Sequence, residues 1–249
     1  MPIKKEFLKL TLLTFVIALC AHNEIRSQEK PSNQDPVALW SECPSVEPKR
    51  QAKSKRYDRL PTGRIIEAPF DVDELPVNVY WWKGLPGLPV AESDAIVVGY
   101  VRDAHAYLSN NRSVVYSEFS LRVDEILKEA AKRLSEGQTI VAQRLGGAVI
   151  FPSGKVQHYR VSKQGFPQTD EKYILFLKSN GQDYDIITGY AIGSGQVIPL
   201  DQGANLPFAS YQGKSVDYFL TEIKQAISAS TQKGSELKWH TAPTCSSQF

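Results

Sequence analysis

Short apolar segments alternate with turns rich in Gly, Pro and Asn from residue 94 to residue 200. Around Phe119, Leu121 and Val123 a polar residue stands at every second position, which is typical of a strand with one buried face. The pattern predicts a mainly β fold, a small closed or partly open β-barrel of about six to eight strands. The expected strands span residues 95–101, 114–126, 139–144, 148–151, 155–161, 172–178, 185–192 and 196–200.

Two segments have the apolar spacing of helices. Residues 127–136 place apolar side chains four and three positions apart and end at Gly137, so we expect a short helix there. Residues 216–227 combine an apolar stripe with a polar face, and Ser215 is suited to cap this C-terminal helix. The strand at 172–178 is apolar on both faces. We therefore expect the amphipathic helix to pack on one face of it and the barrel interior to cover the other.

Glycine-rich turns join the expected strands. Gly193-Ser194-Gly195 predicts a hairpin, and Leu145-Gly146-Gly147 and Pro152-Ser153-Gly154 are compatible with hairpins as well. Gly99, inside the first strand, predicts a bend or the close approach of another backbone.

The first 20 residues have the pattern of a secretory signal peptide. Lys4, Lys5 and Lys9 precede the apolar run LTLLTFVIAL, and polar residues follow. The run is about half as long as the roughly 20 residues of a membrane-spanning helix, so it predicts export and a secreted or periplasmic, cell-envelope location. We expect cleavage near Cys20 or Ala21. Alternatively, Ile17-Ala18-Leu19-Cys20 resembles a lipobox, in which case Cys20 would carry a lipid and anchor the chain to the membrane.

The charge of the mature chain argues against nucleic acid as a partner. Residues 1–20 hold three of the 29 basic residues and one of the 27 acidic ones, so the remainder is formally neutral. We expect contact with a membrane through the signal peptide or a lipid anchor at Cys20.

The remaining chain divides by composition. Residues 21–64 are polar and predict a disordered linker with a basic cluster. Residues 65–228 predict a single β-barrel domain with a strap across it and the C-terminal helix, and residues 229–249 a flexible tail. The basic cluster is either a solvated part of the linker or a contact for anionic envelope polymers or lipid headgroups, and it comprises Lys49, Arg50, Lys53, Lys55, Arg56 and Arg59.

Two cysteines remain after cleavage of the signal peptide, Cys43 and Cys245. Both lie in segments that resemble loops, so they either pair in a disulfide or stay as separate thiols. Neither belongs to a Cys-x-x-Cys motif, and the sequence predicts no metal site.

Aromatic residues supply the weak candidates for ligand binding. Tyr80, Trp81 and Trp82 stand between prolines, and they either cover the barrel as part of a strap or form a stacking platform for a sugar or a peptide. An apolar groove lined by these residues or by Tyr107 would indicate a ligand site.

No catalytic motif stands out in the sequence. The four histidines form no zinc-binding pattern, and a Gly-x-Ser-x-Gly elbow is missing. We therefore expect a protein that is not an enzyme and needs no cofactor. The alternative is a cryptic hydrolase whose residues assemble only in the fold, with Asp94, His105, Glu118 and His158 as the first candidates.

Three segments carry a resemblance to known proteins: residues 93–101, residues 116–128 and residues 172–177. They resemble a widespread set of exported bacterial proteins without an assigned activity. The order of the strands resembles the OB-like barrel of netrin modules and of tissue inhibitors of metalloproteinases. Those inhibitors chelate zinc through an N-terminal Cys-x-Cys, which this sequence lacks, so the inhibitory activity does not carry over.

The resemblance implies an OB-like barrel that serves as a binding scaffold. The expected function is therefore that of an exported, non-catalytic binding or structural module of the bacterial cell envelope. Its partner would be a protein or an envelope polymer. A lipid-anchored structural lipoprotein and the cryptic hydrolase remain the alternatives.

Overall fold

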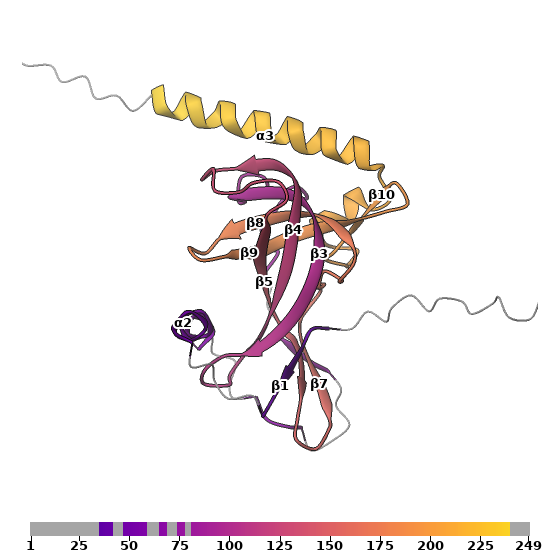
Figure 1. The fold of residues 1–249 in the computed structure, drawn as a ribbon. Helices are drawn as coiled ribbons and strands as arrows, with labels where there is room; N and C mark the ends of the chain where they lie inside the picture. The colour runs from indigo at the N-terminus through magenta and orange to yellow at the C-terminus, as the bar shows by residue number, and fades with distance from the viewer. Residues whose placement is uncertain (1–34, 42–46, 59–64, 69–73, 78–80, 240–249) are drawn as a thin grey trace, which may run out of the picture. The chain divides into compact units, whose positions relative to one another are not determined.

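The computed structural model describes residues 35–41, 47–58, 65–68, 74–77 and 81–239. A compact unit that begins at Asp35 contains all of them. Within these ranges, no helix has both the length and the apolar character required to cross a membrane. The described chain is β-rich, with two sheets and two α-helices (Figure 1).

The larger sheet has six strands in the order β10-β9-β5-β4-β3-β8. Strand β9 pairs with β10, with β8 in antiparallel register and, through two residue pairs, with β5 in parallel register. Because β9 contacts both β5 and β8, the sheet is partly ring-like. The strands are β3 (Ala95–Leu108), β4 (Val115–Glu129), β5 (Thr139–Leu145), β8 (Lys172–Ser179), β9 (Tyr184–Gly193) and β10 (Gln196–Pro199).

The inner face of the ring holds an apolar core to which β3, β4, β5, β8 and β9 all contribute. On β4 this face carries Phe119, Leu121 and Val123, all fully buried, so the alternation seen in the sequence matches the structure. Gly99 is a point of close approach, because a Cβ there would lie 2.7 Å from the carbonyl oxygen of Arg122. The ladder between β3 and β4 shifts register beside it.

The outer face of β8 and β9 is covered by α3 (Val216–Trp239) and by the short helix η1 (Pro207–Tyr211). Phe219 of α3 lies against Tyr190 of β9, with ring centroids 4.4 Å apart, and Phe176 of β8 belongs to the same buried cluster. Strand β8 is thus buried on both faces, as predicted. Ser215 caps α3, since its Oγ accepts a hydrogen bond from the amide of Tyr218.

The second sheet has the order β1-β6-β7-β2. Its strands are β1 (Val37–Leu39), β6 (Gly147–Ile150), β7 (Val156–Val161) and β2 (Glu74–Val77). Ala38, Val149 and Tyr159 of this sheet pack against Ala106 and Val115, which lie at the far ends of β3 and β4. The two long strands run side by side and contribute to both cores (Figure 1).

The chain passes from one sheet to the other at Gly146, in a turn whose sequence is compatible with a hairpin. Strands β5 and β6 belong to different sheets, so Leu145-Gly146-Gly147 is not a hairpin turn. Gly146 has φ +101°, and a Cβ on it would lie 2.5 Å from the carbonyl oxygen of Tyr159, so the change of sheet requires glycine. The turns at Pro152-Ser153-Gly154 and Gly193-Ser194-Gly195 do connect antiparallel pairs, as predicted.

The short helix expected at 127–136 is wrong. Strand β4 continues to Glu129, because the backbone of its last residues pairs with Ala95 and Ile96 of β3. The Lys128 ammonium donates to the carbonyl oxygens of Val90 and Ser93, which fixes the same end of the strand. Long-range strand pairing therefore outweighs the local helical spacing.

The linker prediction for residues 21–64 is also wrong in the part that the structure describes. That part contains β1 and the helix α2 (Pro48–Tyr57), and Lys53 and Ser54 of α2 are buried. The tail predicted at 229–249 begins too early, because α3 continues to Trp239. The signal peptide at 1–20 lies outside the described residues, and export stays a prediction.

Candidate functional site

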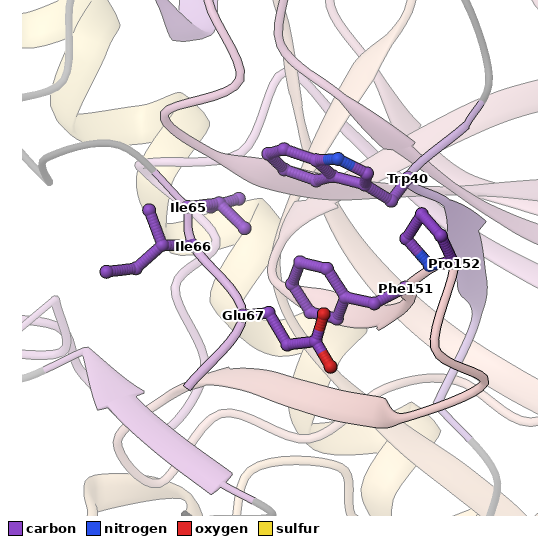
Figure 2. Close-up of a pocket in the computed structure, with 6 residues that line it drawn as sticks. All are labelled: Trp40, Ile65, Ile66, Glu67, Phe151 and Pro152. Atoms are coloured by element: carbon purple, nitrogen blue, oxygen red, sulfur yellow. The ribbon is translucent and has the colours of Figure 1, made fainter. Parts of the chain in front are cut away.

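An apolar pocket opens beside the second sheet. It has a volume of about 350 Å³ and is lined by Trp40, Ile65, Ile66, Glu67, Phe151 and Pro152. Figure 2 shows the side chains of Trp40, Ile65 and Phe151 converging on one space, with Ile66 further out and the Glu67 carboxylate near Phe151. The rings of Trp40 and Phe151 lie with their centroids 5.3 Å apart. The pocket is suited to an apolar side chain.

Three separate segments build this pocket. Trp40 follows β1, and its amide donates to the carbonyl oxygen of Ile150 at 2.9 Å, which holds it level with the end of β6. Phe151 follows β6 directly. The segment of Ile65 is fixed by a hydrogen bond from its amide to the carbonyl oxygen of Arg112, and the Arg112 guanidinium lies 4.7 Å above the Trp40 ring.

Exposed apolar side chains lie at the mouth of the pocket and on the opposite face of the second sheet. Ile66, at its mouth, exposes 65% of its surface. On β1, Val37 and Leu39 expose 40% and 51% and point away from Ala38, which is buried. Leu39 aligns with Ile150, and Ile150 aligns with the exposed Val156 of β7, so an apolar row crosses the outer face of this sheet. Such exposure is typical of an interaction surface.

Sequence reasoning missed this pocket because residues 37–40 stand within a polar stretch. The short apolar run Val37-Ala38-Leu39-Trp40 was the available signal. It is too short to predict a strand on its own, and only its pairing with β6 gives it a structure.

Helix α2 lies over the outer face of β4 and β5 and forms the second notable site. Lys53 of α2 is only 5% exposed, and its ammonium contacts Asp183 Oδ2 at 2.5 Å and Glu118 Oε1 at 2.9 Å. Arg50 also contacts Glu118, at 2.5 Å. Two basic side chains of the helix therefore share carboxylates of the sheet and of the β8–β9 loop.

A polar pocket of about 310 Å³ lies between α2, β5 and β9. Gln143 on its wall accepts hydrogen bonds from the Tyr57 hydroxyl at 2.9 Å and from Arg56 Nη2 at 3.4 Å. Burial raises the pKa of the Asp185 carboxyl, while a hydrogen bond from Asn180 and the nearby Arg56 act in the opposite direction. Burial also raises the pKa of the Tyr57 hydroxyl.

The predicted aromatic candidates do not form one groove. Tyr80 lies outside the described residues. Trp81 stacks on Phe208 and donates through Nε1 to the carbonyl oxygen of Ser162 at 3.2 Å, and Trp82 packs beside it. Both tryptophans thus pack against the α3 side of the sheet. Tyr107 lies elsewhere, under the Arg50 guanidinium at 3.9 Å.

The four candidates for a cryptic hydrolase each have their own partners. Asp94 accepts from the amide of Ser179 at 2.9 Å. His105 contacts Asp103 at 2.9 Å, and His158 contacts the buried Asp35 at 2.8 Å, so the two histidines use different carboxylates. Glu118 is the register partner of His105 across the β3–β4 ladder, but its carboxylate binds α2.

Within the described residues, neither a metal site nor a cysteine adds a further candidate site. Among the described residues, no three His, Cys, Asp or Glu side chains form a group that would hold a metal ion. Cys20, Cys43 and Cys245 lie outside these residues, so the lipid anchor and the disulfide stay predictions.

Comparison with known proteins does not supply a function. No protein-family model and no curated protein matches this sequence. The resemblance to exported bacterial proteins and to netrin modules therefore stays a prediction, and the function has to be argued from the geometry of the two sites.

Proposed function

We propose that this chain is an exported, non-catalytic binding module of the bacterial cell envelope, and that it holds an extended apolar segment of a partner protein against β1 and the pocket of Trp40, Ile65 and Phe151. The observation that carries the proposal is the open apolar pocket, with Ile66 exposed at its mouth, beside a short strand with exposed apolar side chains. Stable monomeric surfaces seldom combine these features without a binding role.

Strand β1 favours a peptide as the ligand. Among the described strands it is the end strand of its sheet, and end strands bind extended peptides by adding a further strand. Successive side chains of an added strand point to opposite faces. One set would then lie beside Trp40 and the pocket, and the other beside Leu39 and the apolar row.

The lining favours a protein over an envelope polymer. Five of the six lining residues are apolar, and the carboxylate of the sixth, Glu67, accepts a hydrogen bond from Ser153 at 2.5 Å. A polysaccharide site requires several hydrogen-bonding groups that are aimed at hydroxyls, which this lining does not offer.

The partly ring-like sheet supports the proposal that the scaffold is an OB-like barrel. The ring contains β3, β4, β5, β9 and β8, and all five strands contribute to one interior core. An OB-like barrel is a small, partly open barrel of about five strands that presents one face and its loops to ligands. The non-catalytic character is supported by the separate ion pairs that hold His105, Glu118 and His158.

Selection from a random peptide library tests the binding site. We expect the protein without residues 1–20 to select peptides rich in apolar residues, and Ile66→Asp and Leu39→Asp to weaken their binding by about tenfold or more. Ile198→Asp is the matched control, because Ile198 lies in the larger sheet and exposes 45% of its surface. Equal binding by all three variants would contradict the proposed site.

Export is tested separately by the intact mass of the protein from the cell envelope. A chain that begins near Ala21 supports cleavage of a signal peptide. A diacylglyceryl group on Cys20 would establish the lipid-anchored alternative, and a chain that begins at Met1 in the cytoplasm would contradict export.

A further inference from the structure

Helix α2 has a composition that does not favour a free helix. Within Pro48–Tyr57 it carries Lys49, Arg50, Lys53, Lys55 and Arg56, and none of its first-turn residues is acidic. Like charges three or four positions apart, such as Arg50 and Lys53 or Lys49 and Lys53, repel one another. A helix this short is also marginal in isolation. The carboxylates of Glu118 and Asp183 beneath it therefore supply much of the stabilisation of α2.

The contacts between α2 and the sheet follow the helical period. The inner side of the helix carries residues three or four positions apart: Arg50, then Lys53 and Ser54, then Tyr57. Arg50 and Lys53 bind the Glu118 carboxylate, and Lys53 also binds Asp183. Lys49 and Lys55 are exposed on the other side. Glu118 and Asp183 thus match a defined spacing of cations along the helix and not only its net positive charge.

Aromatic rings complete the recognition. Tyr57 stacks on Tyr116 of β4 with centroids 4.2 Å apart, and Ser54 Oγ lies 2.8 Å from the Tyr116 hydroxyl. The Arg50 guanidinium lies 3.9 Å above the ring of Tyr107, an arrangement that adds cation–π attraction. Tyr107 and Tyr116 lie near one another, so the sheet presents an aromatic pair in addition to its carboxylates.

Two loops of the ring contact the helix. In the β3–β4 loop, Asn110 Nδ2 donates to the carbonyl oxygen of Gln51, and the amide of Asn111 donates to Asp58 Oδ1. In the β8–β9 loop, Asp183 binds Lys53. OB-like barrels bind their ligands on the face of the second and third strands and with these two loops. Only this comparison with OB-like barrels rests on the barrel proposed above.

The chemistry of the α2 contact differs from that of α3. Helix α3 is fixed by Phe219 and Ile223, both fully buried in an apolar cluster. Helix α2 is fixed by ion pairs, hydrogen bonds and stacked tyrosines. Polar and charged contacts are typical of reversible interfaces, whereas apolar cores are typical of permanent ones.

We propose that the face formed by Tyr107, Tyr116, Glu118, Gln143 and Asp183 is a binding site for a cationic helical peptide, and that α2 occupies this site in cis. The peptide that fits has basic residues three positions apart and an aromatic residue four positions after the second one. A partner with this pattern competes with α2 for the same carboxylates. This site is separate from the apolar pocket.

A labelled peptide tests the proposal in the full chain. The probe is residues 47–58 as a fluorescein-labelled synthetic peptide, measured by fluorescence anisotropy at low salt. We expect weak binding to the wild-type chain, whose face is occupied, and at least about tenfold tighter binding to the Lys53→Glu chain, whose own helix no longer fits. The Lys55→Glu chain is the matched control and should bind as weakly as the wild type, because Lys55 is exposed.

Peptide variants separate recognition from general charge attraction. The peptide with Lys53→Glu should lose binding to the Lys53→Glu chain, whereas the peptide with Lys55→Glu, of equal net charge, should keep it. Equal binding of the two peptides would overturn the proposal. So would the absence of binding to a Lys53→Glu chain whose circular dichroism matches the wild type, because α2 would then be a permanent part of the fold. Ile66→Asp should leave peptide binding unchanged, which distinguishes this site from the apolar pocket.

Hydrogen exchange gives a second measurement on the wild-type chain in case Lys53→Glu does not fold. Raising the salt concentration from about 0.05 to about 0.5 M screens the basic side chains of α2 once the helix has left the sheet, which favours undocking, so its amides should exchange about tenfold faster or more. The amides of β4 and β5 should not change. Equal salt responses in the helix and the strands would overturn the proposal.

Discussion

Arg144 of β5 and Asp201, which follows β10, form a fully buried bidentate ion pair with N–O distances of 2.7 and 2.8 Å. The Asp201 carboxylate also accepts hydrogen bonds from Thr188 Oγ1 at 2.7 Å and from the amide of Gly165 at 3.0 Å. The pair thus joins β5, β9, the loop before β8 and the segment after β10. All of the charge on both side chains is compensated within the protein.

Asp201→Ala should lower the free energy of unfolding by about 3–5 kcal/mol, because it leaves the Arg144 guanidinium buried without a counter-charge. Denaturant melts measure the change. Asp103→Ala removes the exposed partner of His105 and should cost at most about 1 kcal/mol. Similar losses in the two variants would show that the buried pair has no special weight.

Phe176→Ala should lower the free energy of unfolding by about 3–5 kcal/mol, because the Phe176 side chain is fully buried in the apolar cluster under α3. Phe219→Ala, on the covering helix, should cost about 2–4 kcal/mol, since the helix can move to fill part of the space. Denaturant melts of the two variants test this order. A neutral Phe219→Ala would mean that α3 does not stabilise the sheet.

Gly146→Ala should destabilise the protein more than Gly154→Ala. Both glycines have positive φ, so each substitution carries about 1–2 kcal/mol of backbone strain. At Gly146 the new methyl group would also overlap the carbonyl oxygen of Tyr159, whereas nothing lies within 4 Å at Gly154. The difference between the two melts isolates the cost of the overlap, and equal losses would contradict it.

Asp185→Asn should raise the free energy of unfolding above that of the wild type, and the gain should be larger at neutral pH than at acid pH. Burial raises the pKa of Asp185 above its ordinary value of 3.8, so the folded state binds the proton more tightly than the unfolded state. The contribution of Asp185 to stability is therefore complete below its unfolded pKa and is lost as the pH rises through its folded pKa. The side-chain oxygen of an asparagine at this position can still accept the hydrogen bond from Asn180 Nδ2, and the side chain carries no charge. Melts at about pH 3 and pH 7 measure the variant against the wild type. A difference independent of pH would contradict the expectation.

The strands of the ring were predictable because their signal is local. Phe119, Leu121 and Val123 alternate with polar residues within a single strand, and the apolar run of β8 directly predicts burial on both faces. The hairpin at Gly193-Ser194-Gly195 likewise depends only on neighbouring residues. The helix expected at 127–136 was wrong because the end of β4 is determined by its pairing with Ala95 and Ile96, about thirty residues earlier in the chain.

Both sites depend on contacts that no local pattern encodes. Helix α2 has almost no apolar stripe, so its burial follows from Glu118 and Asp183, which are distant in sequence. The apolar pocket requires Trp40, Ile65 and Phe151 to come from three segments. Composition predicted a linker in this region because polarity there was interpreted as a lack of partners, whereas the partners lie in the sheet.

Strands β3 and β4 supply side chains to the ring core and to the core of the second sheet, so the two cores share a continuous backbone. A ligand that binds the apolar pocket therefore stabilises residues far from it, by RT ln(1 + [L]/Kd). At a ligand concentration of about 100 Kd this amounts to about 2.7 kcal/mol, enough to raise the melting temperature by several degrees. A thermal-shift screen of candidate ligands on the intact protein would then report occupancy of the pocket before any partner has been identified.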